Sequence, residues 1–186
     1  LELYLTVPAT ASASRGDKPV TAITRLPSTS SMEPVQGGPL VGIYHTHACE
    51  SFLTELPEAN VLRPDDAHSR DEAYTVVRVG REMASVLNST YGVGAVHSPE
   101  MHDIEGKLGA YVKSEATVAR ILKEYPSVKI LLDVHRDSQP RERTTVEARG
   151  QAFARVMAVI GVDNARWKAN EAFASELLRA LDAETP

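Results

Sequence analysis

Residues 40–50 read LVGIYHTHACE and contain a structural signal followed at once by a chemical one. The first five residues form an apolar run of strand length, which is typical of a strand buried on both faces of a sheet. A similar run, VKILLDV, occupies residues 128–134 and ends directly before His135. Strands of this kind occur in α/β proteins, so the two segments predict that fold class.

The segments around these two runs alternate between strand and helix patterns. Apolar residues at helical spacing predict helices at 73–88, 111–125 and 165–183. Shorter apolar or alternating stretches predict further strands at 1–7, 92–96 and 151–160, and a charged, proline-containing loop at 48–72. We therefore expect a mixed, mostly parallel twisted sheet flanked by helices.

Composition limits the class of protein. The chain has 186 residues, 24% of them charged, with a net charge of -5, which suits one ordinary globular domain and makes nucleic acid a poor partner. Cys49 is the sole cysteine, so an internal disulfide and a multi-cysteine zinc module are excluded. No apolar run approaches the roughly 18 residues of a membrane span. We divide the chain into an arm or strand with long loops at 1–39 and a catalytic domain at 40–186.

The two central strands both end in histidine, where sites lie in open α/β sheets. His47 and Glu50 form a His-x-x-Glu pair after the first strand, and His135 ends the second. Hydrolytic zinc sites use three ligands of this type and leave a position open for water. The spacing alone is a weak signal, but its place at the strand ends predicts a zinc site.

Several motifs together resemble one known family. Residues 43–52 are similar to the I-Y-H-T-H-x-x-E-S-Y signature of the stage II sporulation protein P family. The resemblance extends over residues 40–182 and includes, in order, residues 76–80, 96–97, 101–103, 121–126, 132–137 and 164–173.

The resemblance implies a cell-wall enzyme. The family resembles the zinc-dependent N-acetylmuramoyl-L-alanine amidases, which suggests an amidase-like fold and cleavage of the amide between N-acetylmuramic acid and L-alanine. Endopeptidase activity on peptide cross-links is also implied. Peptidoglycan is then the substrate, a lytic transglycosylase a partner, and the location extracytoplasmic, with a membrane anchor outside this sequence.

Carried over to this chain, the resemblance supports His47 and His135 as zinc ligands. For the third ligand we favour Glu50, while Glu72 matches the place of the ligand glutamate in the broader amidase group. His45 is two residues from His47, so within a strand both side chains would point the same way. We expect His45 to act as a ligand, to support the site or to be a hydrogen-bonded strand-end residue.

Four further residues of the matched motifs are candidates. His102 and Asp103 are expected to contact substrate, to support the ligands or to be structural. Arg136 could neutralise a developing oxyanion or a peptide carboxylate, and Asp137 could orient an imidazole. A salt-bridged loop is the alternative for both.

Relatives carry a late Leu-x-x-Glu segment whose glutamate serves as general base and acid, and these 186 residues contain no match to it. We therefore expect either a domain truncated before that glutamate or an inactive wall-binding scaffold. A zinc endopeptidase or carboxypeptidase acting on wall peptides is the third alternative, because the same ligand set serves in such enzymes.

Overall fold

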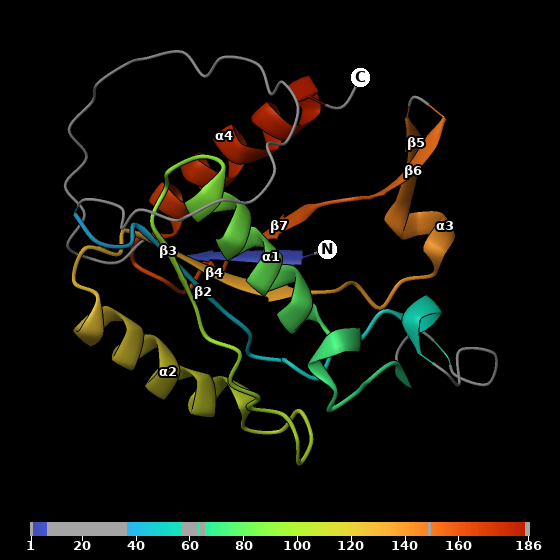
Figure 1. The fold of residues 1–186 in the computed structure, drawn as a ribbon, viewed down its shortest axis with the longest axis horizontal. Coiled ribbons are helices and arrows are strands. Elements are labelled where there is room, and N and C mark those ends of the chain that lie inside the picture. The colour runs from blue at the N-terminus through green and yellow to red at the C-terminus, as the bar shows by residue number, and fades with distance from the viewer. Residues whose placement is uncertain (1, 7–36, 57–62, 64–65, 149, 185–186) are drawn as a thin grey trace.

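The structure is a computed structural model that describes residues 2–6, 37–56, 63, 66–148 and 150–184 (Figure 1). Most of the arm that we expected at 1–39 therefore lies outside the described residues. The helices are α1 Val76–Ser89, α2 Ala110–Glu124, α3 Arg141–Thr144 and α4 Trp167–Glu184, with short 3₁₀ turns η1 Leu53–Glu55 and η3 Glu72–Tyr74. The strands are β1 Glu2–Thr6, β2 Val41–Tyr44, β3 Ala95–His97, β4 Ile130–His135, β5 Thr145–Ala148, β6 Gln151–Ala154 and β7 Met157–Val159.

The main sheet has five strands in the order β3-β2-β4-β1-β7. β2 is parallel to both β3 and β4, with Ile43 opposite His97 on one side and Leu132 on the other. β1 is antiparallel to β4 and parallel to β7. The predicted mixed, mostly parallel sheet is confirmed, and the carboxyl ends of β2, β3 and β4 meet at one edge.

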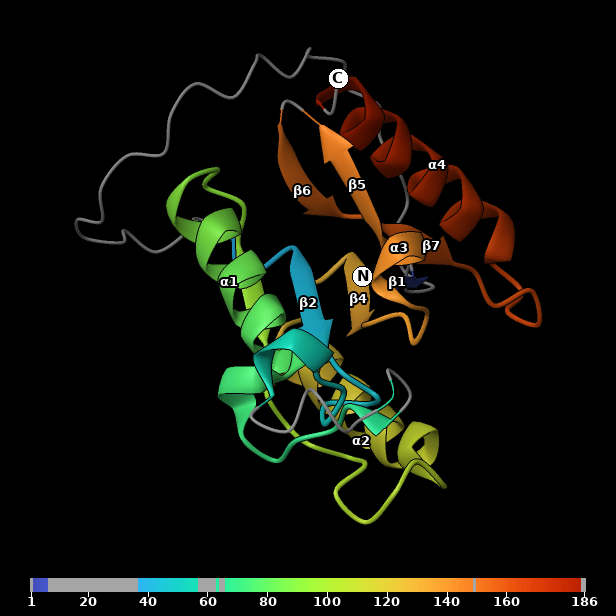
Figure 2. The same cartoon turned by 90° about the vertical axis from the view of Figure 1, so that its right-hand side faces the viewer.

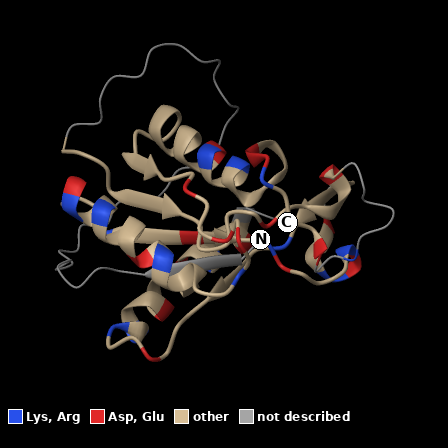
Figure 3. Ribbon diagram, turned by 90° about the horizontal axis from the view of Figure 1, so that it is seen from below, with Lys and Arg blue, Asp and Glu red and all other residues tan. Residues whose placement is uncertain are grey.

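Helices cover both faces of this sheet. Inward residues of β2 and β4, including Ile43 and Val134, pack with α1 and α4 in one core cluster. Leu131, which points to the other face, packs with Ile121 of α2 in a second cluster. Figures 1 and 2 show the resulting layers, with α2 on the opposite side of the sheet from α1 and α4. Residues with positive and negative charge are interspersed along the outer helices and loops (Figure 3).

The predicted elements are present, and their bounds differ locally. α1 begins at Val76, three residues late, because the Thr75 hydroxyl accepts a hydrogen bond from the Val77 amide and caps the helix there. The strand predicted at 151–160 is two strands, β6 and β7. β6 pairs with β5 in a separate hairpin, which the sequence patterns did not predict. None of the helices in the described part of the chain combines the length and apolarity needed to cross a membrane.

Candidate metal centre

The centre lies where β2 and β4 end. β4 ends at His135, whereas β2 ends at Tyr44 and the chain then turns back through residues 45–49. Glu50 is held by this turn, with its amide donating to the His47 carbonyl at 3.1 Å. One carboxylate oxygen of Glu50, Oε2, lies 3.2 Å from His135 Nδ1 and accepts the Arg136 amide at 3.1 Å. The predicted pair Glu50 and His135 is thus in direct contact.

His135 lies between two carboxylates. Its second ring nitrogen, Nε2, is 3.0 Å from Asp133 Oδ1. Asp133 is itself fixed by Thr46, whose amide and hydroxyl donate to the two carboxylate oxygens at 2.7 and 2.5 Å. Burial alone would lower the pKa of His135, but the contacts with Asp133 and Glu50 outweigh it and raise that pKa to about 9. The two carboxylates therefore favour the protonated form of the ring.

His47 stands beside this group. Its ring centroid is 5.4 Å from that of His135 and also 5.4 Å from that of Tyr111. Its Nδ1 is buried, has no hydrogen bond among the described residues, and lies 3.8 Å from Asp103 Oδ2. The other oxygen of Asp103 accepts the Cys49 amide at 3.0 Å. Burial lowers the pKa of His47, so its ring is neutral and able to bind a metal.

The residues fit zinc by donor type and by spacing. Ligands about 2.0–2.1 Å from a tetrahedral zinc are roughly 3.3 Å apart, and their imidazole centroids roughly 5 Å apart. The Glu50–His135 contact of 3.2 Å and the 5.4 Å between the two histidine rings agree with these values. Within the described ranges, no three His, Cys, Asp or Glu side chains already converge in metal-binding geometry. Zinc binding would thus require the side chains of His47, Glu50 and His135 to rearrange.

His45 points away from this centre. Because β2 ends at Tyr44, the strand alternation does not continue to His47, and the two histidines of the motif diverge. His45 is fully buried, with Nδ1 2.9 Å from the Val134 carbonyl oxygen and Nε2 2.9 Å from His97 Nε2. His45 therefore supports the packing of α1 against the sheet, with His97 as its partner.

The remaining candidates have distinct surroundings. Arg136 is 6% exposed and donates through Nη2 to the Ala67 carbonyl at 3.1 Å. Asp137 is half-buried and accepts the amide of Gln139 at 2.9 Å, which caps a turn. His102 is buried, and its Nε2 has no hydrogen bond in the described part of the chain.

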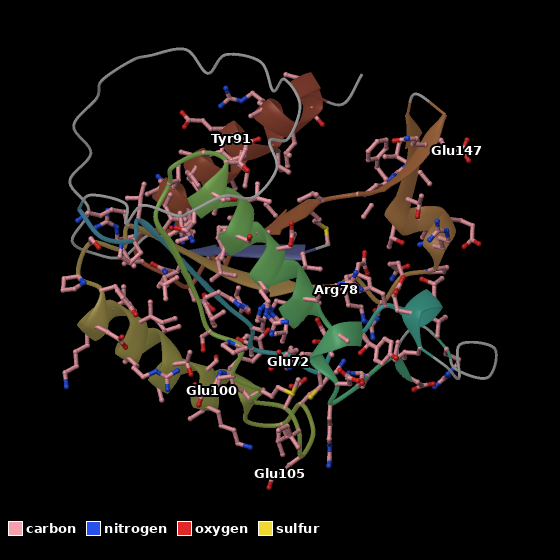
Figure 4. All side chains as sticks on the ribbon, viewed as in Figure 1. Glu72, Arg78, Tyr91, Glu100, Glu105 and Glu147 are labelled. Atoms are coloured by element: carbon pink, nitrogen blue, oxygen red, sulfur yellow. The ribbon has the colours of Figure 1, made fainter. Side chains whose placement is uncertain are left out.

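Glu72, the alternative ligand, lies at η3 just before α1 (Figure 4) and pairs with Arg81. Their side chains are 39% and 55% exposed, respectively. This ion pair gives Glu72 a partner of its own on the surface, whereas Glu50 is buried against His135.

Two residues near the centre were missed by sequence reasoning. Asp133 is two residues before His135 in a strand, so the alternation of side chains places both on one face. That signal was available in the sequence. Tyr111, at the start of α2, contacts His47 only because of the tertiary fold, and no local pattern marks it.

The family model described as "Stage II sporulation protein P (SpoIIP)" matches residues 9–186, which include all the residues of this centre. The stage II sporulation protein P of Bacillus subtilis (strain 168) is 32% identical over 155 residues. That match covers 79% of this chain and 37% of the Bacillus protein, so the chain spans little more than a third of its relative. No solved structure matches the chain.

Proposed function

The chain belongs to the stage II sporulation protein P family, and from this premise we propose that it is the catalytic part of a zinc-dependent peptidoglycan hydrolase. The bond cleaved is the amide between N-acetylmuramic acid and the L-alanine of the stem peptide. The observation that supports this proposal is the position of His135 between Glu50 and Asp133, with the His47 ring beside it.

His47, Glu50 and His135 would hold the zinc. When bound, zinc lowers the pKa of water and polarises a carbonyl group, and both effects favour attack on an amide. Asp133 Oδ1 lies 3.0 Å from His135 Nε2, close enough to accept its proton after a small rotation of the ring, and Nδ1 would then face the metal. A carboxylate of this kind orients a metal-binding histidine and makes it more basic.

Asp103 has the same relation to His47. Its Oδ2 lies 3.8 Å from His47 Nδ1, so a short movement would let it accept that proton and direct Nε2 towards the metal. Each histidine would then have its own carboxylate, which is the arrangement common in zinc enzymes. The Arg136 amide donates a hydrogen bond to Glu50 Oε2, and this bond fixes the position of the proposed ligand.

The proposal is tested by metal analysis and by wall digestion. We expect about one zinc per chain, as in a three-ligand site, with loss of zinc in His47→Ala and His135→Ala. His68→Ala, which removes an exposed imidazole and leaves the backbone bridge between residue 68 and Glu50 in place, is the matched control and should retain the metal. Full zinc occupancy in His135→Ala would contradict the ligand set.

The products identify the bond. Digestion of purified peptidoglycan should release peptides with a new L-alanine amino terminus. New termini within the peptides would instead indicate an endopeptidase or carboxypeptidase with the same ligands, and wall binding without any product would indicate a scaffold. Because the substrate lies outside the cytoplasmic membrane, we place the reaction there, with a lytic transglycosylase as the partner that cuts the glycan.

A further inference from the structure

A cavity lies beside the candidate metal centre. Its volume is about 240 Å³, and it lies between residues 51–54, the loop that follows β4 and the β5–β6 hairpin. Ser51, at its wall, directly follows the ligand Glu50. Arg136, also at its wall, donates its amide to Glu50. The cavity wall is therefore continuous in sequence with two of the proposed metal ligands, Glu50 and His135.

The charged groups in the cavity wall favour an anion. They are two arginines and one aspartate, Arg136, Asp137 and Arg141. Asp137 uses one carboxylate oxygen to cap the turn at Gln139. Arg136 is 6% exposed, and its Nε has no hydrogen bond among the described residues. That atom is enclosed by protein and Nη2 donates to the Ala67 carbonyl, so Arg136 contributes positive charge to the wall rather than an accessible donor.

Arg141 adds an accessible cation at the same place. It begins α3, its side chain is exposed, and it has no ion pair with any residue that the structure describes. An arginine fork binds a carboxylate through two parallel hydrogen bonds. Arg141 thus offers an accessible fork to an anionic group in the cavity, and the buried charge of Arg136 adds to the positive potential there.

The other walls suit short apolar side chains. Phe52 comes from the segment after Glu50 and Phe153 from β6, and Ala152 and Ala154 lie on the same strand as Phe153. The cavity is smaller than the roughly 300–1,000 Å³ of pockets that enclose a drug-sized ligand. It is therefore suited to one or two amino-acid residues.

The hairpin itself stands apart from the main sheet, as Figures 1 and 2 show. The residues of β6 are exposed throughout. A two-stranded hairpin is marginally stable by itself, so contact with an extended peptide would stabilise it and could add backbone hydrogen bonds.

We propose that this cavity is the subsite for an acidic peptide, with Arg141 binding its carboxylate. The inference rests on the proposed function, in which that peptide is the stem peptide following the cleaved amide. The subsite would hold the peptide on the Glu50 side of the metal, so that the scissile amide is placed over the centre.

The test uses Arg141→Gln in the whole 186-residue chain. The probes are a soluble muramoyl-peptide fragment with free carboxylates and the same fragment with its carboxylates amidated. Binding is measured directly by calorimetry and, separately, KM and kcat are measured for cleavage. Arg143→Gln is the matched control, because Arg143 is in the same short helix but not in the cavity wall.

We expect Arg141→Gln to weaken binding of the carboxylate fragment and to raise its KM about tenfold, which corresponds to about 1.4 kcal/mol, with little change in kcat. Arg141→Lys should recover part of the affinity, and Arg143→Gln should resemble the wild type. The amidated fragment should bind weakly to all four proteins. Equal binding of the carboxylate fragment by wild type and Arg141→Gln would overturn the proposal, as would equal binding of the two fragments by the wild type.

The two readouts separate this inference from the proposed function. Binding that depends on Arg141 without cleavage would contradict the hydrolase and leave the peptide subsite standing. Cleavage that does not depend on Arg141 would contradict the subsite and leave the hydrolase standing.

Discussion

Glu50→Gln and Glu72→Gln together distinguish the two candidates for the third zinc ligand. Glutamine at position 50 keeps one oxygen, which can still accept the Arg136 amide, but it removes the negative charge beside His135. Loss of a residue that merely orients a metal ligand reduces affinity by about 10–100-fold. For loss of a ligand we expect at least about 100-fold, or about 2.7 kcal/mol.

The same pair of variants should differ in stability without metal. Removing the only partner of a buried charge costs about 3–5 kcal/mol. Since Asp133 still contacts His135 in Glu50→Gln, we expect a smaller loss, about 2 kcal/mol in the free energy of unfolding. Glu72 forms an exposed ion pair with Arg81, and such pairs contribute at most about 1 kcal/mol.

The assays are zinc titration against a chelator of known affinity and urea denaturation of the metal-free protein, both at pH 7. Glu72→Gln should bind zinc as the wild type does. If Glu72→Gln loses zinc and Glu50→Gln retains it, the assignment of Glu50 is refuted. The stability measurement shows whether a loss of zinc in Glu50→Gln is secondary to unfolding.

Three further predictions concern the surroundings of the centre. Gly80→Ala should lower the unfolding free energy by about 1–3 kcal/mol, despite better helix propensity, because the added carbon would lie 2.6 Å from Nε2 of the buried His45; an unchanged urea midpoint would contradict this. Burial lowers the pKa values of His45 and His97 to about 4, so the unfolded chain binds protons first, and stability should fall as pH drops from about 6.5 to about 4; a flat profile of unfolding free energy against pH in that window would refute it. Asp133→Asn should lower the pKa of His135 from about 9 in the metal-free protein, as followed by NMR titration, and an unshifted titration would show that Asp133 is not what raises it.

The apolar runs of β2 and β4 were sufficient to predict the fold class. A strand that is buried on both faces needs apolar residues at nearly every position, and such strands occur mainly in α/β proteins. The β5–β6 hairpin could not be predicted in this way. β6 is exposed throughout and β5 is only partly buried, and the sequence there, RERTTVEARGQAFAR, lacks the apolar alternation that burial imposes. Residues 151–160 were therefore read as one strand, although β6 belongs to the hairpin and β7 to the main sheet.

In the candidate site too, some contacts could be predicted from the sequence and others could not. Glu50 and His135 were predicted as neighbours from the strand ends, since the carboxyl ends of parallel strands meet at one edge of a sheet. The contacts of Asp103 with the Cys49 amide and with His47 depend on how the loop after β3 folds back over the turn at 45–49. No spacing in the sequence contains that information, because it arises from the tertiary packing of two loops.

The end of β2 links the core to the proposed chemistry. If the strand continued past Tyr44, alternation would place His45 and His47 on the same face, and both would point into the core with Ile43. The strand instead ends, His45 remains in the core against α1, and the turn carries His47 to the edge of the sheet near His135. Thr46 lies between the two histidines, and its amide donates a hydrogen bond to Asp133 of β4. This bond stabilises the turn. Three consecutive residues therefore have different roles: His45 packs in the core, Thr46 bonds to Asp133, and His47 is a candidate ligand. This difference explains why the two histidines are not interchangeable.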